Sequence, residues 1–312
     1  TLRTCFPDAA GQPLQRIAEM LAIPFIQRDL RGLPEADRQM RAREYAREEA
    51  LRPFVLATGP LIRATLLQLA DSEYVLLLTM HHIISDGWSM GVVSRELAAL
   101  YDAFVHHQPC SLAPLPIQYA DFAHWQRQWF RGAVFRKQMA YWRDQLANLP
   151  VLDLPTDRPR PPIQTYAGAT HILALPRTLT DKLETLSRQE GVTLAVSLLA
   201  AYQSLMVRYT GQTDIVVGSP IANRNRTEIE GLVGFFVNSL VMRADLSGDP
   251  SFLEVLARVQ EVALGARERM RAATRSSSRC ISSGDRVSVC AMPSRTAASP
   301  SMRSPSNARR RA

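Results

Sequence analysis

Two adjacent histidines, His81 and His82, precede the pair Asp86 and Gly87 in the stretch MHHIISDGWS, residues 80–89. Imidazole is the side chain whose pKa lies nearest neutrality, so a histidine at a reacting centre takes up and returns a proton at physiological pH. Metal binding is the weaker hypothesis, because adjacent residues of an extended chain point to opposite faces and no third ligand is evident. The stretch therefore predicts acid–base chemistry without a bound metal.

The motif lies where a strand is followed by a helix. Residues 74–80, YVLLLTM, have the composition of a buried strand, and apolar residues recur at helical spacing from residue 88 to residue 106. A side chain at such a junction projects from rigid scaffolding. Structural readings stay open here, since a histidine at a strand end is often a satisfied core residue and an aspartate before a helix is a good N-cap.

The rest of the pattern predicts an α/β or α+β fold in two lobes. A strand at 61–69 forms a hairpin with the strand at 74–80. Helices are expected at 34–51, at 118–149 with a break near Gly132, at 179–189, from an N-cap at Thr193, and at 250–267; further strands are expected at 171–175, 214–218 and 235–246. Four prolines in residues 152–162 exclude a continued helix, and this segment is predicted to link the lobes.

Composition is that of an ordinary folded protein, with 46% of the 312 residues hydrophobic and 21% charged. No apolar run approaches the roughly 18 to 20 residues that cross a bilayer, and the first residues show no charged-then-apolar signal, so a cytoplasmic location is expected. The four cysteines show neither C-x-x-C spacing nor a dense framework. The absence of both patterns favours free thiols over disulfides or a zinc site, and no metal is expected.

The basic character is confined to the C-terminal segment. Nine arginines and a single acidic residue, Asp285, follow residue 270 and account for the whole net charge of +8. Residues 267–312 also carry eleven serines and lack sustained periodicity, so they cannot build a core. One hypothesis is a disordered basic arm that binds nucleic acid. We favour another, a segment read out of frame, because nothing else in the sequence suggests nucleic acid.

Residues 80–89 resemble the central HHxxxDG motif of the condensation domains of nonribosomal peptide synthetases, members of the chloramphenicol-acetyltransferase-like acyltransferase superfamily. Four further segments match that family's pattern in the same order: LRTCF at 2–6, YADFAHW at 119–125, LPTDRPR at 154–160 and VGFFVNSLVMR at 233–243. The histidine motif alone would also fit acyl-CoA transferases. The YADFAHW and FVNS segments favour the peptide-synthetase branch.

The resemblance implies a V-shaped pseudo-dimer of two chloramphenicol-acetyltransferase-like lobes, each an α+β two-layer sandwich. It divides the chain into an N-terminal lobe at 1–154 whose start is missing, a partial C-terminal lobe at 155–266, and an aberrant Ser/Arg-rich tail at 267–312 that is disordered or out of frame. The RHE half of the motif that ends in LRTCF is absent, and the family's HQDxPFE segment does not follow residue 266. We therefore expect an incomplete second lobe and an inactive fragment.

The resemblance also implies a reaction. The amine of an acceptor aminoacyl thioester attacks the carbonyl of a donor thioester, and a peptide bond forms as a thiolate leaves. Both thioesters are carried on 4′-phosphopantetheine arms of donor and acceptor peptidyl carrier domains, beside an adenylation domain of the same synthetase. The chain itself is expected to bind no cofactor, nucleic acid or membrane. Because an α-amine has a pKa of about 7.7 to 8.0 and a thioester is already activated, positioning carries much of the acceleration.

In that reaction His82 is assigned to the acceptor amine, either as general base or as the group that orients the amine. Asp86 is assigned to structure, paired with a buried arginine that is either Arg3 or the arginine of the absent RHE segment. Gly87 is expected to allow close backbone approach and to offer its amide to the oxyanion.

The remaining assignments concern residues around the motif. His81 and Trp88 are expected to pack, and Asn238 is the polar group of the second lobe expected at the tunnel, with a structural hydrogen bond as the alternative. Three other functions stay open: an acyl-CoA-dependent acyltransferase, an epimerising relative, and an inactive docking module.

Overall fold

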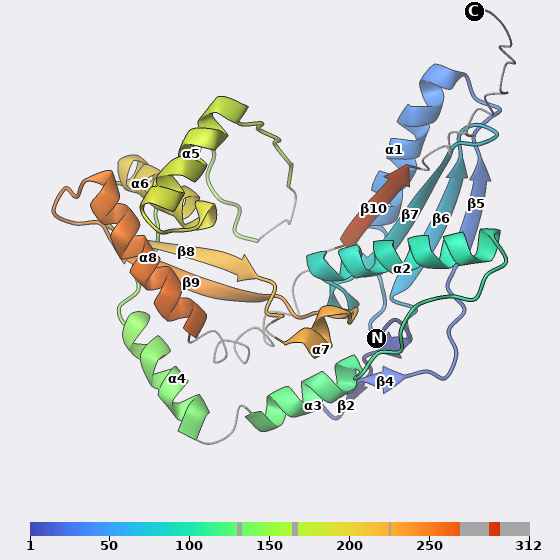
Figure 1. The fold of residues 1–312 in the computed structure, drawn as a ribbon, viewed down its shortest axis with the longest axis horizontal. Coiled ribbons are helices and arrows are strands. Elements are labelled where there is room, and N and C mark those ends of the chain that lie inside the picture. Colours follow the sequence, from blue (N-terminus) through green and yellow to red (C-terminus); the bar gives the residue numbers. More distant parts are fainter. Residues whose placement is uncertain (130–132, 164–167, 225, 269–286, 294–312) are drawn as a thin grey trace, which may run out of the picture. The chain divides into compact units, whose positions relative to one another are not determined.

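A computed structural model describes residues 1–129, 133–163, 168–224, 226–268 and 287–293. The chain forms two compact units, the first made of Thr1–Asp86 with the segment from Asp285 onward and the second of Gly87–Gly284 (Figure 1). The division therefore runs through the histidine motif. The lobe boundary expected at residue 154 stays a prediction. The mixture of helices and sheets in both units confirms the predicted α/β (α+β) fold class.

The first unit is built on a four-stranded sheet in the order β10-β7-β6-β5. Its elements are β1 (Thr4–Cys5), β2 (Asp8–Ala9), β3 (Gln12–Pro13), β4 (Arg16–Ile17), β5 (Phe25–Asp29), α1 (Glu35–Leu51), β6 (Ile62–Gln68), β7 (Tyr74–His81), the 3₁₀ helix η1 (His82–Ile84) and β10 (Val287–Pro293). β6 and β7 pair antiparallel, which confirms the predicted hairpin. β5 pairs parallel with β6, and the short strands form two small antiparallel ribbons.

One face of this sheet is buried against α1, which lies along it in Figure 1. Successive residues of a strand alternate between the two faces. Leu67 of β6 and Leu77 of β7 therefore share a face, where they pack with Ala42 of α1. Both leucines are almost fully buried, so β7 is held firmly up to the histidine at its end.

One segment of the tail, Val287–Pro293, lies in the sheet of the first unit. These residues form β10, which pairs antiparallel with β7 over seven positions, from Val287 opposite His81 to Pro293 opposite Val75. Backbone pairing needs only an extended segment and an available strand edge, so it does not require the periodic hydrophobic pattern that the sequence lacks. The other residues of the tail beyond Glu268 lie outside the described part of the chain, and the out-of-frame origin stays a prediction.

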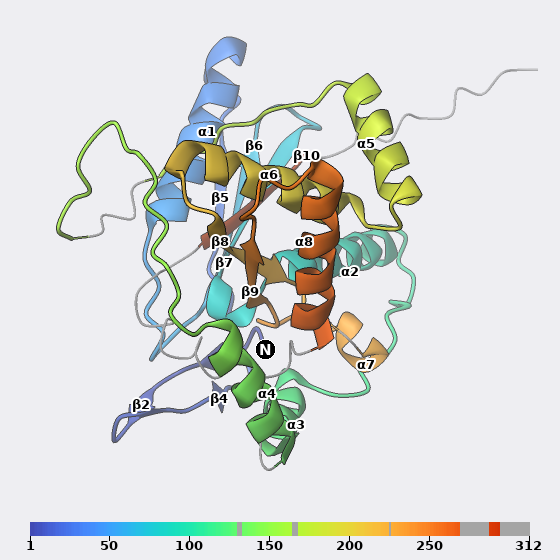
Figure 2. The ribbon, with the colours of Figure 1, turned by 90° about the vertical axis from the view of Figure 1, so that its left-hand side faces the viewer.

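The second unit contains a two-stranded antiparallel sheet and most of the helices. Its elements are α2 (Gly87–Val105), α3 (Tyr119–Trp129), α4 (Ala133–Gln145), α5 (Arg177–Gln189), α6 (Leu194–Thr210), β8 (Asp214–Ile221), α7 (Thr227–Glu230), β9 (Asn238–Asp245) and α8 (Phe252–Glu268). α6 and α8 pack on β8 and β9, as Figures 1 and 2 show, around Ala200, Ile215 and Val259, each fully buried.

Most predicted elements of this unit are confirmed. Thr193 caps α6 by accepting a hydrogen bond from the Val196 amide at 3.3 Å, as expected from the sequence. Residues 152–162 contain no helix. The strand predicted at 171–175 is wrong, because this segment has no strand partner, and Ile172 and Leu173 are largely exposed. The expected break near Gly132 lies outside the described residues.

Cys5 and Cys110 are free thiols, whereas Cys280 and the side chain of Cys290 lie outside the described residues. No group of three or more potential metal ligands occurs in the described residues. In the same part of the chain no single helix is long and apolar enough to cross a membrane, although α5 and α6 together, bent by 104°, meet that composition test.

Candidate active site

His82 opens the 3₁₀ turn that follows β7, and its ring is fixed by one short contact. Nδ1 lies 2.6 Å from the carbonyl oxygen of Ser85, while the Ser85 amide donates to the His82 carbonyl at 3.3 Å. A carbonyl oxygen only accepts, so Nδ1 must carry the proton in this contact. In the neutral ring the basic lone pair is then on Nε2. The turn thus holds Nδ1 as the donor and fixes the tautomer of the neutral ring.

His81 has the opposite arrangement. Its Nδ1 accepts a hydrogen bond from the Ile83 amide at 3.0 Å, so this nitrogen carries no proton. The ring is 4% exposed and meets Phe54 edge-on with ring centroids 5.9 Å apart. His81 therefore acts as the N-terminal cap of η1, a role that the sequence analysis did not predict.

Asp86 is completely buried at the end of the same segment, and Ser85 beside it is also fully buried. The Ser85 hydroxyl has no hydrogen-bond partner among the described residues. Arg3, one of the two arginines expected to pair with Asp86, is exposed and donates to the carbonyl oxygens of Ala18 and Glu19. Those contacts join Arg3 to the neighbouring loop, and the arginine partner of Asp86 stays a prediction.

Gly87 begins α2 with an ordinary backbone conformation. A Cβ atom built at this position meets nothing within 4 Å. Neither a positive φ angle nor close packing therefore requires glycine here, and the space that a side chain would take is open. Trp88 is 45% exposed, and its indole N–H donates to the Glu230 carbonyl at 2.9 Å.

The first turn of α2 is tied to the segment before β9 through Ser89. Its hydroxyl donates to the Gly234 carbonyl at 2.9 Å and accepts from the Gly234 amide at 3.0 Å. Arg224 adds a hydrogen bond to the same hydroxyl at 2.9 Å, and its guanidinium lies 4.0 Å from the centroid of the Phe236 ring. Sequence reasoning missed Ser89 and Arg224, because their partners are more than a hundred residues away along the chain.

The YADFAHW segment packs against the same region. Tyr119 donates to the Phe235 carbonyl at 2.8 Å, and its ring meets Phe236 nearly perpendicularly at 5.1 Å. A Cβ at Gly234 would lie 2.3 Å from the Tyr119 ring, so only glycine fits there. Three segments matched in the sequence, namely WS at 88–89, YADFAHW and VGFFVN, therefore form one packed assembly within the second unit.

Asn238 stands at the start of β9 and is 4% exposed. Its Oδ1 accepts from the Ser239 amide at 2.9 Å, which identifies the other atom of the amide group as the donor Nδ2. Nδ2 has no hydrogen-bond partner among the described residues. A buried donor without a partner is rare in folded proteins, so this atom is suited to a ligand acceptor.

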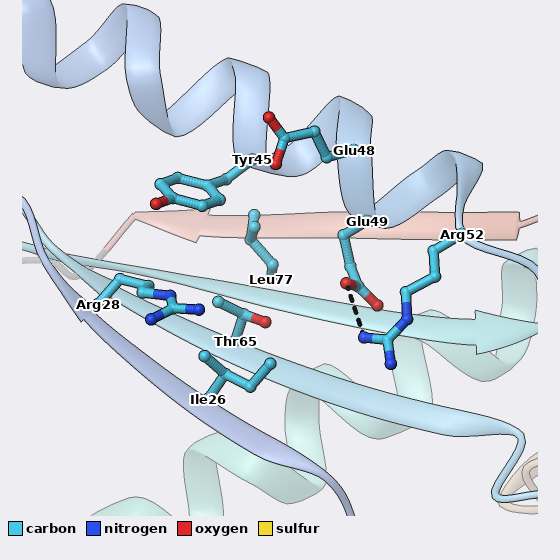
Figure 3. A pocket seen from close by; sticks show the side chains of 8 residues that line it. All are labelled: Ile26, Arg28, Tyr45, Glu48, Glu49, Arg52, Thr65 and Leu77. Carbon is cyan, nitrogen blue, oxygen red and sulfur yellow. Dashed lines mark ion pairs between the residues drawn. The ribbon is translucent and has the colours of Figure 1, made fainter.

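A pocket of about 240 Å³ lies elsewhere in the first unit, between α1 and the face of the sheet (Figure 3). Its lining combines apolar and charged groups: Ile26, Arg28, Tyr45, Glu48, Glu49, Arg52, Thr65 and Leu77. Glu49 pairs with Arg52 at 3.7 Å across one end. None of the predicted site residues lines this pocket, so it is separate from the histidine motif.

Comparison of the chain with known protein families identifies its family. The model of the condensation domain family matches residues 1–273, most of the chain. The chain belongs to the condensation domain family. The match covers both units, including the histidine motif, the YADFAHW segment and the VGFFVN segment, so these resemblances are confirmed at the level of the family. Residues 274–312 lie outside the match.

Relatives and solved structures agree with this membership. This condensation domain is 52% identical over 267 residues to a linear gramicidin synthase protein of Brevibacillus parabrevis, a match that covers 85% of the chain and 3% of that relative. The SgcC5 protein from Streptomyces globisporus superposes with a TM-score of 0.71 at 32% identity, covering 86% of the chain and 60% of that structure. The first condensation domain of the calcium-dependent antibiotic synthetase, at 22% identity and a TM-score of 0.73, has the same fold and is covered over 66% of its length, against 90% of this chain.

Proposed function

We propose that this condensation domain forms a peptide bond between two carrier-bound thioesters. The observation that carries the proposal is the hydrogen bond from His82 Nδ1 to the Ser85 carbonyl, which leaves Nε2 as the basic nitrogen of the motif. Family membership and the similarity to peptide synthetases support it. The chain spans only 3% of the first relative's length, so the reaction is proposed for these residues within the full-length protein.

His82 acts on the acceptor amine. The amine attacks the thioester carbonyl of the donor, Nε2 accepts the proton that the nitrogen loses, and the carbonyl oxygen becomes an oxyanion. When the carbon–sulfur bond breaks, the thiolate leaves and the proton returns to sulfur. A thioester needs no covalent enzyme intermediate, so the main tasks are to align the amine and to receive its proton.

Two further groups are assigned to the substrates. The Gly87 amide, at the start of α2, donates to the oxyanion, and the open space beside the Gly87 Cα lets the substrate approach. Asn238 Nδ2, buried and without a partner in the described residues, donates to a substrate carbonyl. Asp86, completely buried, keeps a structural role with an arginine as its partner.

The partners follow from the reaction. The donor and acceptor thioesters are carried on 4′-phosphopantetheine arms of peptidyl carrier domains, which are substrates rather than resident cofactors. An adenylation domain of the same synthetase loads the acceptor, and the whole assembly works in the cytoplasm. Similarity to synthetases of gramicidin and phosphinothricin tripeptide supports this context.

The test replaces His82 in the full-length protein. His82→Ala should abolish dipeptide formation from donor and acceptor aminoacyl carriers, measured by mass spectrometry of the acceptor carrier, while the melting temperature stays within a few degrees. His106→Ala is the matched control, because His106 is exposed at the end of α2. Turnover by His82→Ala at the rate of the unsubstituted protein would refute the proposal. Product formed from acyl-CoA instead of a carrier would point to an acyltransferase.

A further inference from the structure

Arg63 carries a buried positive charge on β6, opposite Thr79 of β7, which lies two residues before His81. Its side chain is 8% exposed, and its Nε donates to the Glu49 carboxylate. The same guanidinium donates to the carbonyl oxygens of Arg52 at 2.9 Å and of Pro53 and Glu49 at 3.3 Å. These carbonyls lie at and just beyond the end of α1, whose last turn has no basic residue of its own. Arg63 therefore fixes the end of α1 on β6.

The guanidinium of Arg63 also covers the ring of Phe54, with Cζ 3.8 Å from the ring centroid. Phe54 is 9% exposed, and its ring meets the His81 ring at 87° with centroids 5.9 Å apart. Phe54 thus lies between a fixed cation and the first motif histidine. Such cation–ring and edge-to-face contacts favour a particular ring orientation more than simple burial does.

His81 transmits this orientation to the turn that holds His82. Its Nδ1 accepts from the Ile83 amide at 3.0 Å, and its backbone amide donates to the Leu61 carbonyl at 3.0 Å. If the His81 ring rotates, the Ile83 amide loses its acceptor and η1 loses its cap. The turn that His81 caps begins with His82 and is followed by Ser85, whose carbonyl oxygen accepts from the His82 ring.

We propose that Arg63 and Phe54 are positioning residues for His82. They act through His81: the guanidinium fixes Phe54, Phe54 seats the His81 ring, and that ring caps the turn from which His82 projects. The proposal rests on the proposed function only for its effect on rate, because the positions of the two histidine rings can be measured without substrate. Glu49 completes the set by neutralising Arg63.

A purely structural role predicts a different result. If Arg63 and Phe54 only stabilise the unit, removing either lowers the melting temperature and leaves the motif unchanged in the molecules that stay folded. Leu69→Ala provides the matched control for lost stability. Leu69 is 2% exposed and belongs to the core under α1, which includes neither Phe54 nor His81.

The first experiment records long-range ¹H–¹⁵N spectra of the histidine rings in the 312-residue chain without substrate. In the unsubstituted chain His81 should show a protonated Nε2 and His82 a protonated Nδ1. Phe54→Leu and Arg63→Met should shift or broaden both patterns and speed hydrogen exchange of the Ile83 amide about tenfold or more. Leu69→Ala should leave the signals of both histidine rings unchanged. Phe54→Tyr keeps an aromatic ring at this position and should also leave them unchanged.

The second experiment separates rate from binding in the full-length protein. Phe54→Leu should lower kcat for condensation roughly ten- to a hundredfold, as expected for a slightly misplaced catalytic group, with KM within twofold. Arg63→Lys should give an intermediate loss, since lysine keeps the charge but cannot donate to the same four acceptors. If Phe54→Leu fails to fold, Arg63→Lys and Phe54→Tyr decide the question.

The two experiments distinguish a failure of the positioning role from a failure of the proposed function. Unchanged ring signals of His81 and His82 in folded Phe54→Leu and Arg63→Met would overturn the proposal, whatever the kinetics. Disturbed ring signals together with a protein that does not condense aminoacyl carriers even when unsubstituted would support the positioning role and refute the proposed function instead.

Discussion

The side chain of His82 has two nitrogens, and a single backbone carbonyl decides between their roles. Because Ser85 offers only an acceptor at 2.6 Å, Nδ1 is the donor and Nε2 the base. His81, one residue earlier, uses its Nδ1 as an acceptor instead. Two identical residue types in adjacent positions therefore have different hydrogen bonds: His82 donates through Nδ1, the arrangement that the proposed catalysis uses, and His81 accepts through Nδ1 and caps the turn.

The open space at Gly87 gives a prediction at the residue scale. Gly87→Ala should leave the melting temperature unchanged or slightly raised, because the new Cβ meets nothing within 4 Å and alanine is favoured over glycine within a helix by about 1 kcal/mol. Condensation should nevertheless fall about a hundredfold if the space receives the substrate oxygen. Differential scanning fluorimetry and a turnover assay on the same preparation measure both effects. Full activity of Gly87→Ala would remove the glycine from the site.

At the scale of elements, a network of charged side chains lies at the end of β5, beside the buried Leu30. Arg31 pairs with Asp29 at 2.8 Å and with Asp71, in the turn between β6 and β7, at 2.7 Å. The hydrogen bonds from Arg31 lower the pKa of Asp29 from 3.8 to about 2. The carboxylate is thus easier to keep charged in the folded chain than in the unfolded one.

The lowered pKa of Asp29 determines how the stability of the folded chain changes with pH. A group with a depressed folded pKa contributes stability above its unfolded pKa and loses the contribution as the pH falls through the folded value. Asp29→Asn should therefore lose less stability than the unsubstituted chain between pH 4 and pH 2, the interval between the two pKa values of Asp29. Melting temperatures measured across this range test the difference, and Arg31→Gln should reproduce it. Because the pair is exposed, high salt should reduce the effect.

At the scale of the whole molecule, the sheet of the first unit is completed by a segment far away in the sequence. β10 covers the edge of β7 that β6 leaves unpaired. Exposed strand edges invite pairing between copies of a chain. We therefore expect Val287–Pro293 to protect this edge of the sheet.

Two deletions test this role. A chain ending at residue 286 should aggregate more than the full chain, because the edge of β7 is then exposed. A chain ending at residue 293, which keeps β10, should stay as monodisperse as the full chain while losing five arginines and no acidic residue. Size-exclusion chromatography with light scattering compares the two. Equal behaviour of both deletions would show that β10 does not protect the edge.

Local patterns in the sequence were sufficient for much of the fold. The hairpin of β6 and β7, helix α1, the cap at Thr193 and the strand–motif–helix order all follow from periodicity and capping, which act between residues close together in the chain. The segment at 171–175 shows the limit of this reasoning: its composition suits a strand, but a strand also needs a partner, and a partner is not a local property.

The sequence by itself determined the motif and the family that it indicates, whereas the role of His82 at the acceptor amine stays a prediction. Tertiary structure decided which nitrogen of His82 is basic, that Arg3 binds a neighbouring loop, that Arg63 and Phe54 support His81, and that Val287–Pro293 extends the sheet. The physical reason is the same in each case. A side chain's type is written in the sequence, whereas its protonated atom, its ring orientation and its pairing partner depend on groups that only the folded backbone brings within hydrogen-bonding or van der Waals distance.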